Sequence, residues 1–121
     1  MYIRFAIGAD DENPRDMHGP LTEAAHLKNN GLLAPYEEEL VGSIFEKFND
    51  ELPCPPWEDN NWPSDAVSWF KVSAQIFIAL MYDLIAILKE HDVQIQIFKS
   101  DYLFKTYYED AFQVIAVDKR F

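Results

Sequence analysis

The chain contains one long apolar stretch, from Ala66 to His91, that more than any other feature restricts how it can fold. We interpret this stretch as a single helix. Its apolar side chains then cover most of the circumference, at Trp69, Phe70, Val72, Ile76, Phe77, Leu80, Met81, Leu84, Ile85, Ile87 and Leu88. A helix with so wide an apolar arc must be covered on several sides. The part from Val72 to Leu88 is barely long enough to cross a bilayer and contains Gln75 and Asp83, so we expect a buried central helix.

Three elements are expected before this helix. The run Tyr2–Ile7 is rich in β-branched and aromatic residues and predicts a well-covered strand. A short helix is expected from Pro20 to Asn30, because proline suits a first helical turn and the glycine that follows Asn30 suits a helix end. A second helix begins at Pro35. Its apolar residues recur at helical spacing and predict one buried stripe, made of Tyr36, Leu40, Val41, Ile44, Phe45 and Phe48.

Residues 52–64 form an internal linker, rich in proline and tryptophan, within a single domain that covers residues 1–121. Four prolines in so short a run exclude a helix or a central strand. Trp57 and Trp62 either anchor this linker to the core or form an exposed aromatic platform for a ligand or a partner. We favour the anchors, because exposed tryptophan pairs are uncommon. Ser64 or Asp65 is expected to cap the long helix.

The C-terminal part of the chain has the patterns of strands. Val93–Phe98 alternates with a clean period of two, and two further strands are expected at Leu103–Tyr108 and Phe112–Val117. A tight turn at Glu109–Ala111 joins the last two. The resulting order, β-α-α-α-β-β-β, predicts an α+β fold in which a small antiparallel sheet of three to four strands carries three helices on one face.

Acidic residues are concentrated in the first half of the chain. The sequence contains 21 Asp and Glu residues against 10 Lys and Arg residues, which gives a formal net charge of -11. Residues 1–65 contain fourteen acidic and four basic residues, whereas residues 66–121 contain seven and six. We therefore expect one acidic face. Binding to nucleic acid or to an anionic membrane surface is not expected, because both need clustered lysine and arginine.

The single cysteine, Cys54, excludes an intrachain disulfide and suits a reducing compartment. Met1 is followed directly by the strand-like run and not by the basic and apolar regions of a signal peptide. We therefore expect a cytoplasmic protein.

Several segments taken together resemble a known group of proteins. These are the opening strand, the second helix, Trp69-Phe70-Lys71 and the closing run Tyr108-Glu109-Asp110-Ala111-Phe112-Gln113-Val114. Their arrangement is similar to that of a group of short, uncharacterised bacterial proteins, cyanobacterial members among them. The resemblance implies a bacterial, cytoplasmic origin and brings no established activity with it.

Other residues of chemical interest are better explained without a catalytic role. The acidic loop of Asp10, Asp11, Glu12 and Asp16 lacks the spacing of a calcium-binding loop. The three histidines are too scattered for a zinc site, and the acidic neighbours of Cys54 disfavour its thiolate. We therefore predict no catalytic residue, no metal and no cofactor, and a protein suited more to binding than to catalysis.

Charged residues that interrupt apolar segments suggest a candidate ligand site. Arg4 lies in the first strand, Lys71 follows two aromatic residues, and Glu109 and Asp110 occupy the predicted turn. If these segments converge, they form a mixed-charge cleft with aromatic walls. The alternative is a set of ordinary surface charges with a weak salt bridge. The candidate ligand-binding residues are Arg4, Trp57, Trp69, Lys71, Tyr107, Glu109 and Asp110.

Two functions fit these features. The first is a small regulatory or protein-interaction domain whose acidic face binds a basic partner, since one-signed faces steer complementary partners. The residues of this predicted partner face are Glu37, Glu38, Glu39, Glu46 and Asp50. The second is a small-molecule-binding domain or minor enzyme that uses the mixed-charge cleft. A homodimer is compatible with both functions. A second subunit could cover the wide apolar arc of the predicted helix Ala66–His91 and the strand face that carries Gln94 and Gln96.

Overall fold

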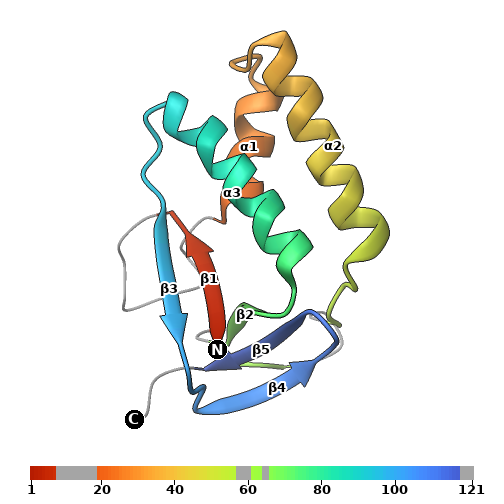
Figure 1. Cartoon of the computed structure of the whole chain (residues 1–121), viewed down its shortest axis with the longest axis vertical. Helices are drawn as coiled ribbons and strands as arrows, with labels where there is room; N and C mark the ends of the chain where they lie inside the picture. The colour runs from red at the N-terminus through yellow and green to blue at the C-terminus, as the bar shows by residue number, and fades with distance from the viewer. Residues whose placement is uncertain (8–18, 57–60, 64–65, 118–121) are drawn as a thin grey trace.

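The computed structural model describes residues 1–7, 19–56, 61–63 and 66–117. The predicted acidic loop, Trp57, Ser64 and Asp65 lie outside the described residues. In chain order the elements are β1 (Tyr2–Ala6), α1 (Pro20–Asn29), α2 (Pro35–Glu51), β2 (Val67–Lys71), α3 (Gln75–Glu90), β3 (Gln96–Ser100), β4 (Lys105–Glu109) and β5 (Gln113–Val117). The predicted α+β class is confirmed, and so are the positions of the first strand and the first two helices (Figure 1).

The sheet has five strands in the order β3-β1-β2-β5-β4, and every pair is antiparallel. The prediction of three to four strands was therefore wrong, as was the predicted order of elements. Strand β1 is an interior strand, because Tyr2 lies opposite Lys71 of β2 on one side and opposite Ser100 of β3 on the other. Strands β3 and β4 form the two edges of the sheet.

The missing strand lies inside the predicted long helix. Residues Val67–Lys71 form β2, and the helix begins only at Gln75, so the expected helix Ala66–His91 was wrong in its first third. Strand β2 is covered on both faces, since Phe70 packs with the helices whereas Trp69 packs on the opposite side. A strand covered on both faces has no apolar–polar alternation and cannot be distinguished from a buried helix by periodicity. Among the described helices, none is long and apolar enough to cross a membrane.

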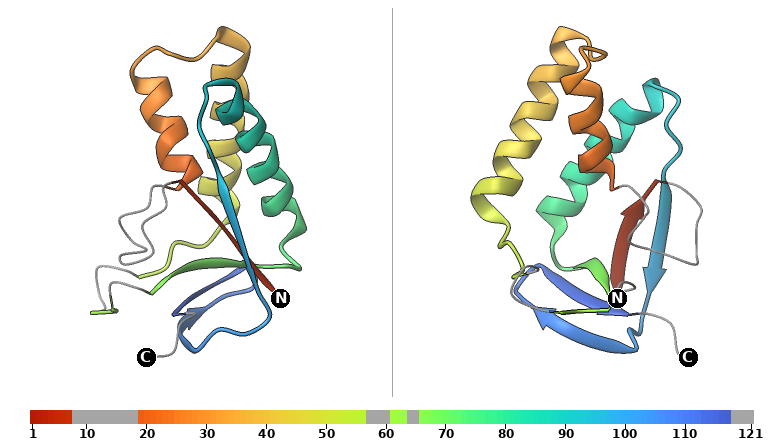
Figure 2. Two further views of the ribbon diagram at one scale, coloured as in Figure 1. Left: turned by 90° about the vertical axis from the view of Figure 1, so that its left-hand side faces the viewer. Right: turned by 180° about the vertical axis from the view of Figure 1, so that it is seen from behind.

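The three helices lie together on one side of the curved sheet (Figures 1 and 2). The largest core cluster joins Ile3 and Phe5 of β1 to buried residues of all three helices. On α3 the fully buried residues include Leu84 and Leu88, so this helix is the buried centre of the layer. Helix α3 packs against both α1 and α2. The predicted position of the helices on one face agrees with this arrangement.

The opposite face of the sheet has a smaller core of its own. Trp69 of β2 packs there with Val114 and Ala116 of β5. Leu103, from the connection between β3 and β4, completes this cluster and is itself buried. The β3–β4 connection therefore covers the face that the helices leave free.

Two helices end with a residue in the left-handed conformation. After α1, Gly31 has φ 67° and the Leu32 amide donates to the Leu27 carbonyl over 3.0 Å. After α3, Asp92 has φ 61° and the amide of the next residue donates to the Leu88 carbonyl over 3.1 Å. This hydrogen-bond pattern satisfies carbonyls that a helix end leaves unpaired, and glycine is its usual residue.

Candidate functional site

The structure brings two of the predicted ligand-binding residues into contact. Lys71 at the end of β2 and Glu109 at the end of β4 form an ion pair, with 2.5 Å between Nζ and Oε2. Strand β5 lies between their strands, so the two side chains reach across it. The Glu109 side chain is half exposed and that of Lys71 is partly exposed. The charges of Lys71 and Glu109 therefore pair with each other near the protein surface.

The other predicted ligand-binding residues have partners of different kinds. The Arg4 guanidinium lies over the Phe98 ring, 5.4 Å from its centroid, and Lys105 lies over the ring of Tyr107 at 5.0 Å. Trp69 is 2% exposed, and its buried Nε1 atom has no hydrogen-bond partner in the part of the chain that the structure describes. Trp57 lies outside the described residues.

Asp110 organises the turn between β4 and β5. Its Oδ1 accepts hydrogen bonds from the amides of Phe112 (2.8 Å) and Gln113 (3.0 Å), and its Oδ2 accepts from the Tyr108 hydroxyl (2.9 Å). Burial raises the pKa of Asp110, but these hydrogen bonds outweigh it and hold the pKa below its ordinary value. The same contact raises the pKa of Tyr108, because its hydroxyl donates to a carboxylate. Asp110 thus has a structural explanation that needs no ligand.

Gln113 is a buried polar residue that the sequence did not single out. It is 3% exposed, its Nε2 donates to the Pro53 carbonyl (2.8 Å) and to Asp110 (3.1 Å), and its Oε1 accepts from the Ser68 hydroxyl (2.9 Å). These contacts fix the start of the proline-rich linker to the sheet. The signal in the sequence was one amide at the start of an otherwise apolar strand, Gln113–Val117.

Trp62 is the described member of the tryptophan pair in the linker. It is partly buried and packs against the cluster of Ala66, Ile115 and Val117, and 6.3 Å separates the centroids of its ring and the Tyr108 ring. This placement agrees with an anchoring role for Trp62.

The predicted partner face lies on α2, but one of its five carboxylates points inward. Glu37 is 4% exposed and contacts His91, whereas Glu38, Glu39, Glu46 and Asp50 are all exposed. We call these four exposed residues the acidic face. At 1.5 Å per residue, Glu46 lies about 10 Å along the helix from Glu39 and about 6 Å from Asp50. The spacing of seven and then four residues places these three on one line of the helix.

Two large apolar residues adjoin the acidic face. Tyr36 is 70% exposed and Leu40 is 41% exposed, so their expected place in the buried stripe of the second helix was wrong. The buried stripe of α2 consists of Glu37, Val41, Ile44 and Phe48. The one basic residue of the helix, Lys47, pairs with Glu51, and among the described residues none of the four carboxylates of the acidic face has an ion-pair partner.

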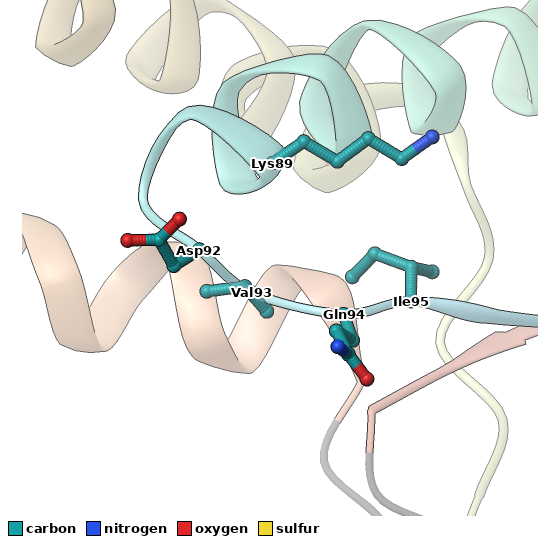
Figure 3. A pocket seen from close by; sticks show the side chains of 5 residues that line it. All are labelled: Lys89, Asp92, Val93, Gln94 and Ile95. Atoms are coloured by element: carbon teal, nitrogen blue, oxygen red, sulfur yellow. The ribbon is translucent and has the colours of Figure 1, made fainter.

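An open hollow lies where α3 turns into β3 (Figure 3). Lys89 extends along α3 above it, Ile95 points toward the helix, and Asp92, Val93 and Gln94 complete the lining. None of these five side chains is fully buried, so the hollow lacks the enclosed polar groups that orient a small ligand. In the part of the chain that the structure describes, no three His, Cys, Asp or Glu side chains cluster so as to hold a metal ion.

Comparisons of this chain with protein-family models, with curated proteins and with solved structures found no match. The resemblance to short bacterial proteins therefore stays a prediction. The acidic face, together with the exposed Tyr36 and Leu40, is the candidate site.

Proposed function

We propose that this protein is an interaction domain that binds a basic protein partner through the acidic face of α2. The observation that carries the proposal is the position of two exposed apolar side chains, Tyr36 and Leu40, beside aligned carboxylates that have no ion-pair partner among the described residues. Charge alone is explained by solubility, since net charge keeps small domains dispersed. An exposed tyrosine beside that charge is typical of a contact surface, because tyrosine is enriched among the residues that contribute most to binding.

The geometry also restricts the chemistry of the partner. Lysine or arginine side chains spaced by about 6 to 10 Å would face Glu39, Glu46 and Asp50. An apolar side chain at one end of that row would cover Tyr36 and Leu40. We therefore expect a basic helix or segment that carries a hydrophobic residue, and not a nucleic acid, whose phosphates the same carboxylates repel.

The second candidate, a small-molecule site around Arg4, Lys71 and the residues Tyr107–Asp110, has less support. Lys71 and Glu109 already neutralise each other, and Asp110 is occupied by hydrogen bonds within its own turn. We rank the acidic face first for this reason.

A synthetic basic peptide tests the proposal directly. The probe is a lysine-rich helical peptide with one leucine or phenylalanine near its end, and binding is measured by titration calorimetry at low and high salt. The variant Glu39→Gln/Glu46→Gln should weaken binding by about tenfold, because each exposed charge pair contributes up to about 1 kcal/mol. Tyr36→Ala should weaken binding at both salt concentrations, because it removes apolar contact area.

The matched control is Asp83→Asn/Glu90→Gln, which changes the net charge by the same amount on exposed positions of α3. It should leave peptide binding nearly unchanged. If both double variants weaken binding equally, the peptide senses net charge only and the acidic face of α2 is not the site. No binding of the peptide to the unmodified protein would also contradict the proposal.

A further inference from the structure

The two edges of the sheet differ in how well they are protected. Strand β4 carries a register irregularity between Thr106 and Tyr108, and such bulges block pairing with another strand. Strand β3 pairs with β1 in continuous register from Gln96 to Ser100. No strand in the described part of the chain pairs with its outer edge. Ile97, in the middle of β3, is 41% exposed.

We propose that two copies of this chain associate through the outer edges of their β3 strands. The two strands run antiparallel about a two-fold axis at Phe98 and join the two sheets into one. A two-fold interface uses the same surface of each copy, so every contact occurs twice. This inference goes beyond the proposed function and does not depend on the partner of α2.

The choice of Phe98 as the centre follows from the residues that it brings together. On the helix-free face, Phe98 meets Phe98 of the second copy, and Gln96 meets Ser100 of the second copy. Aromatic pairs directly across an antiparallel ladder are stabilising, and Arg4 already lies over the Phe98 ring. On the helix-bearing face, Ile97 meets Lys99 of the second copy, whose alkyl chain can cover it while its charge stays in water.

The same register produces a complementary charge pair. One residue before β3, Ile95 meets Asp101 of the second copy. Lys89 and Ile95 line the same hollow (Figure 3), so this register brings the carboxylate of the second copy to the side of the strand where Lys89 lies. The pair forms twice, and both side chains are exposed in the single chain. The outer edge of β3 is thus complementary to the same edge of a second copy, and we therefore take a second copy of this chain as its binding partner.

The position of β3 also permits association despite the net charge. Residues 89–101 contain two basic and three acidic side chains and are therefore almost neutral. Helix α2 lies on the opposite side of the molecule from β3 in Figure 1 and in the right-hand view of Figure 2. A pair of chains joined at β3 keeps its two acidic faces far apart and pointing outward.

The molar mass in solution tests the association. Sedimentation equilibrium across a range of concentrations should show a dimer. Ile97→Lys places a lysine opposite Lys99 of the second copy, and the two-fold axis repeats this like-charge contact. The variant should therefore raise the dissociation constant by about tenfold or more. Thr106→Lys, on the exposed part of the β4 edge, is the matched control and should leave it unchanged. A single-chain mass at the highest soluble concentration, or dissociation by Thr106→Lys and not by Ile97→Lys, would overturn the proposal.

Charge reversal keeps the test valid if Ile97→Lys fails to fold. Lys89→Asp and Asp101→Lys should each weaken the dimer, and the combined variant should restore it, because the pair is then reversed and not lost. Additive weakening in the combined variant contradicts the Lys89–Asp101 contact and, with it, the axis at Phe98.

Cross-linking tests the register. In a Cys54→Ser background, which removes the exposed free thiol, Gln96→Cys and Ser100→Cys are prepared as separate proteins. Oxidation of their mixture should yield a covalent dimer, whereas each protein alone should not. Cross-linking of either protein with itself, but not of the mixture, would place the axis elsewhere and overturn the proposed register.

Discussion

Glu37 at the start of α2 contacts His91 at the end of α3, with 3.0 Å between Glu37 Oε1 and His91 Nε2 and 3.1 Å from the same nitrogen to Oε2. Oε1 of the carboxylate also accepts a hydrogen bond from the Ala34 amide over 2.8 Å. One buried side chain therefore caps α2 and holds two helices together at their ends. The contact combines a negative group near a helix N-terminus with a histidine near a helix C-terminus, as the helix dipoles favour.

We predict that Glu37→Gln lowers the melting temperature by several degrees at neutral pH. The hydrogen bond from the Ala34 amide, followed by that from His91, holds the pKa of Glu37 below its ordinary value of 4.5. The folded chain thus favours the carboxylate more than the unfolded chain does. The stabilisation is complete above the ordinary pKa and is lost as the pH falls through the folded-state pKa. Thermal unfolding at a series of pH values should show the two proteins converging in acid.

The control is Glu38→Gln, which makes the same charge change at an exposed neighbouring position. It should change the stability by no more than about 0.5 kcal/mol. Parallel pH curves for Glu37→Gln and Glu38→Gln would show that Glu37 has no special role.

We predict that Asp110→Asn lowers the stability by about 1 to 2 kcal/mol and shifts the titration of Tyr108. The amides of Phe112 and Gln113 lose a charged acceptor, and hydrogen bonds to charged groups are stronger than neutral ones. The hydrogen bond to Asp110, then burial, then the nearby negative charge raise the pKa of Tyr108 above 10.0. The hydrogen bond from the Tyr108 hydroxyl to Asp110 therefore stabilises the fold fully below pH 10.0, and this stabilisation is lost as the pH rises through the folded-state pKa of Tyr108.

Ultraviolet titration of the phenolate measures this effect, with Tyr108→Phe assigning the signal. The pKa of Tyr108 should move toward its ordinary value in Asp110→Asn. An unchanged tyrosine titration in that variant would contradict the contact between the two side chains.

The sequence predicted the elements whose signals are local. The helix that begins at Pro35 and the strand at Tyr2 have the expected residue types at their ends, and both lie where they were placed. Strand β2 could not be predicted in the same way, because the pairing of Val67–Lys71 with β1 and β5 involves residues far away in the chain. Tertiary contacts, and not local propensity, determine the conformation of this segment.

The candidate site shows the same limit. The acidic face could be predicted, because charge along a helix follows from spacing alone. That Glu37 points inward could not, since its orientation depends on His91, 54 residues away in the sequence. The exposure of Tyr36 and Leu40 also escaped prediction, because periodicity groups them with the buried stripe at its margin.

We predict that Asp92→Gly stabilises the protein by about 0.5 kcal/mol. Asp92 ends α3 with φ 61°, a conformation that costs a residue with a side chain more than it costs glycine. The gain is small because glycine also has more freedom in the unfolded chain. The reverse experiment is Gly31→Ala, at φ 67°, which should destabilise by about 1 kcal/mol. Urea unfolding of both variants measures the effects, and a destabilised Asp92→Gly would contradict the argument.

We predict that Trp69→Phe costs less than about 1 kcal/mol, although Trp69 is among the largest fully buried side chains. Its indole nitrogen has no acceptor among the described residues, and a buried unpaired donor destabilises the fold by about 1 to 3 kcal/mol. Phenylalanine removes that donor while losing part of the packing with Val114 and Leu103, so the two effects offset each other. Trp69→Ala removes the whole aromatic ring and leaves a cavity, and it should lower the free energy of unfolding by about 3 to 5 kcal/mol. Urea unfolding compares the free energies of unfolding of the two variants. If Trp69→Phe loses nearly as much stability as Trp69→Ala, the indole nitrogen is hydrogen-bonded in solution, for example to an internal water.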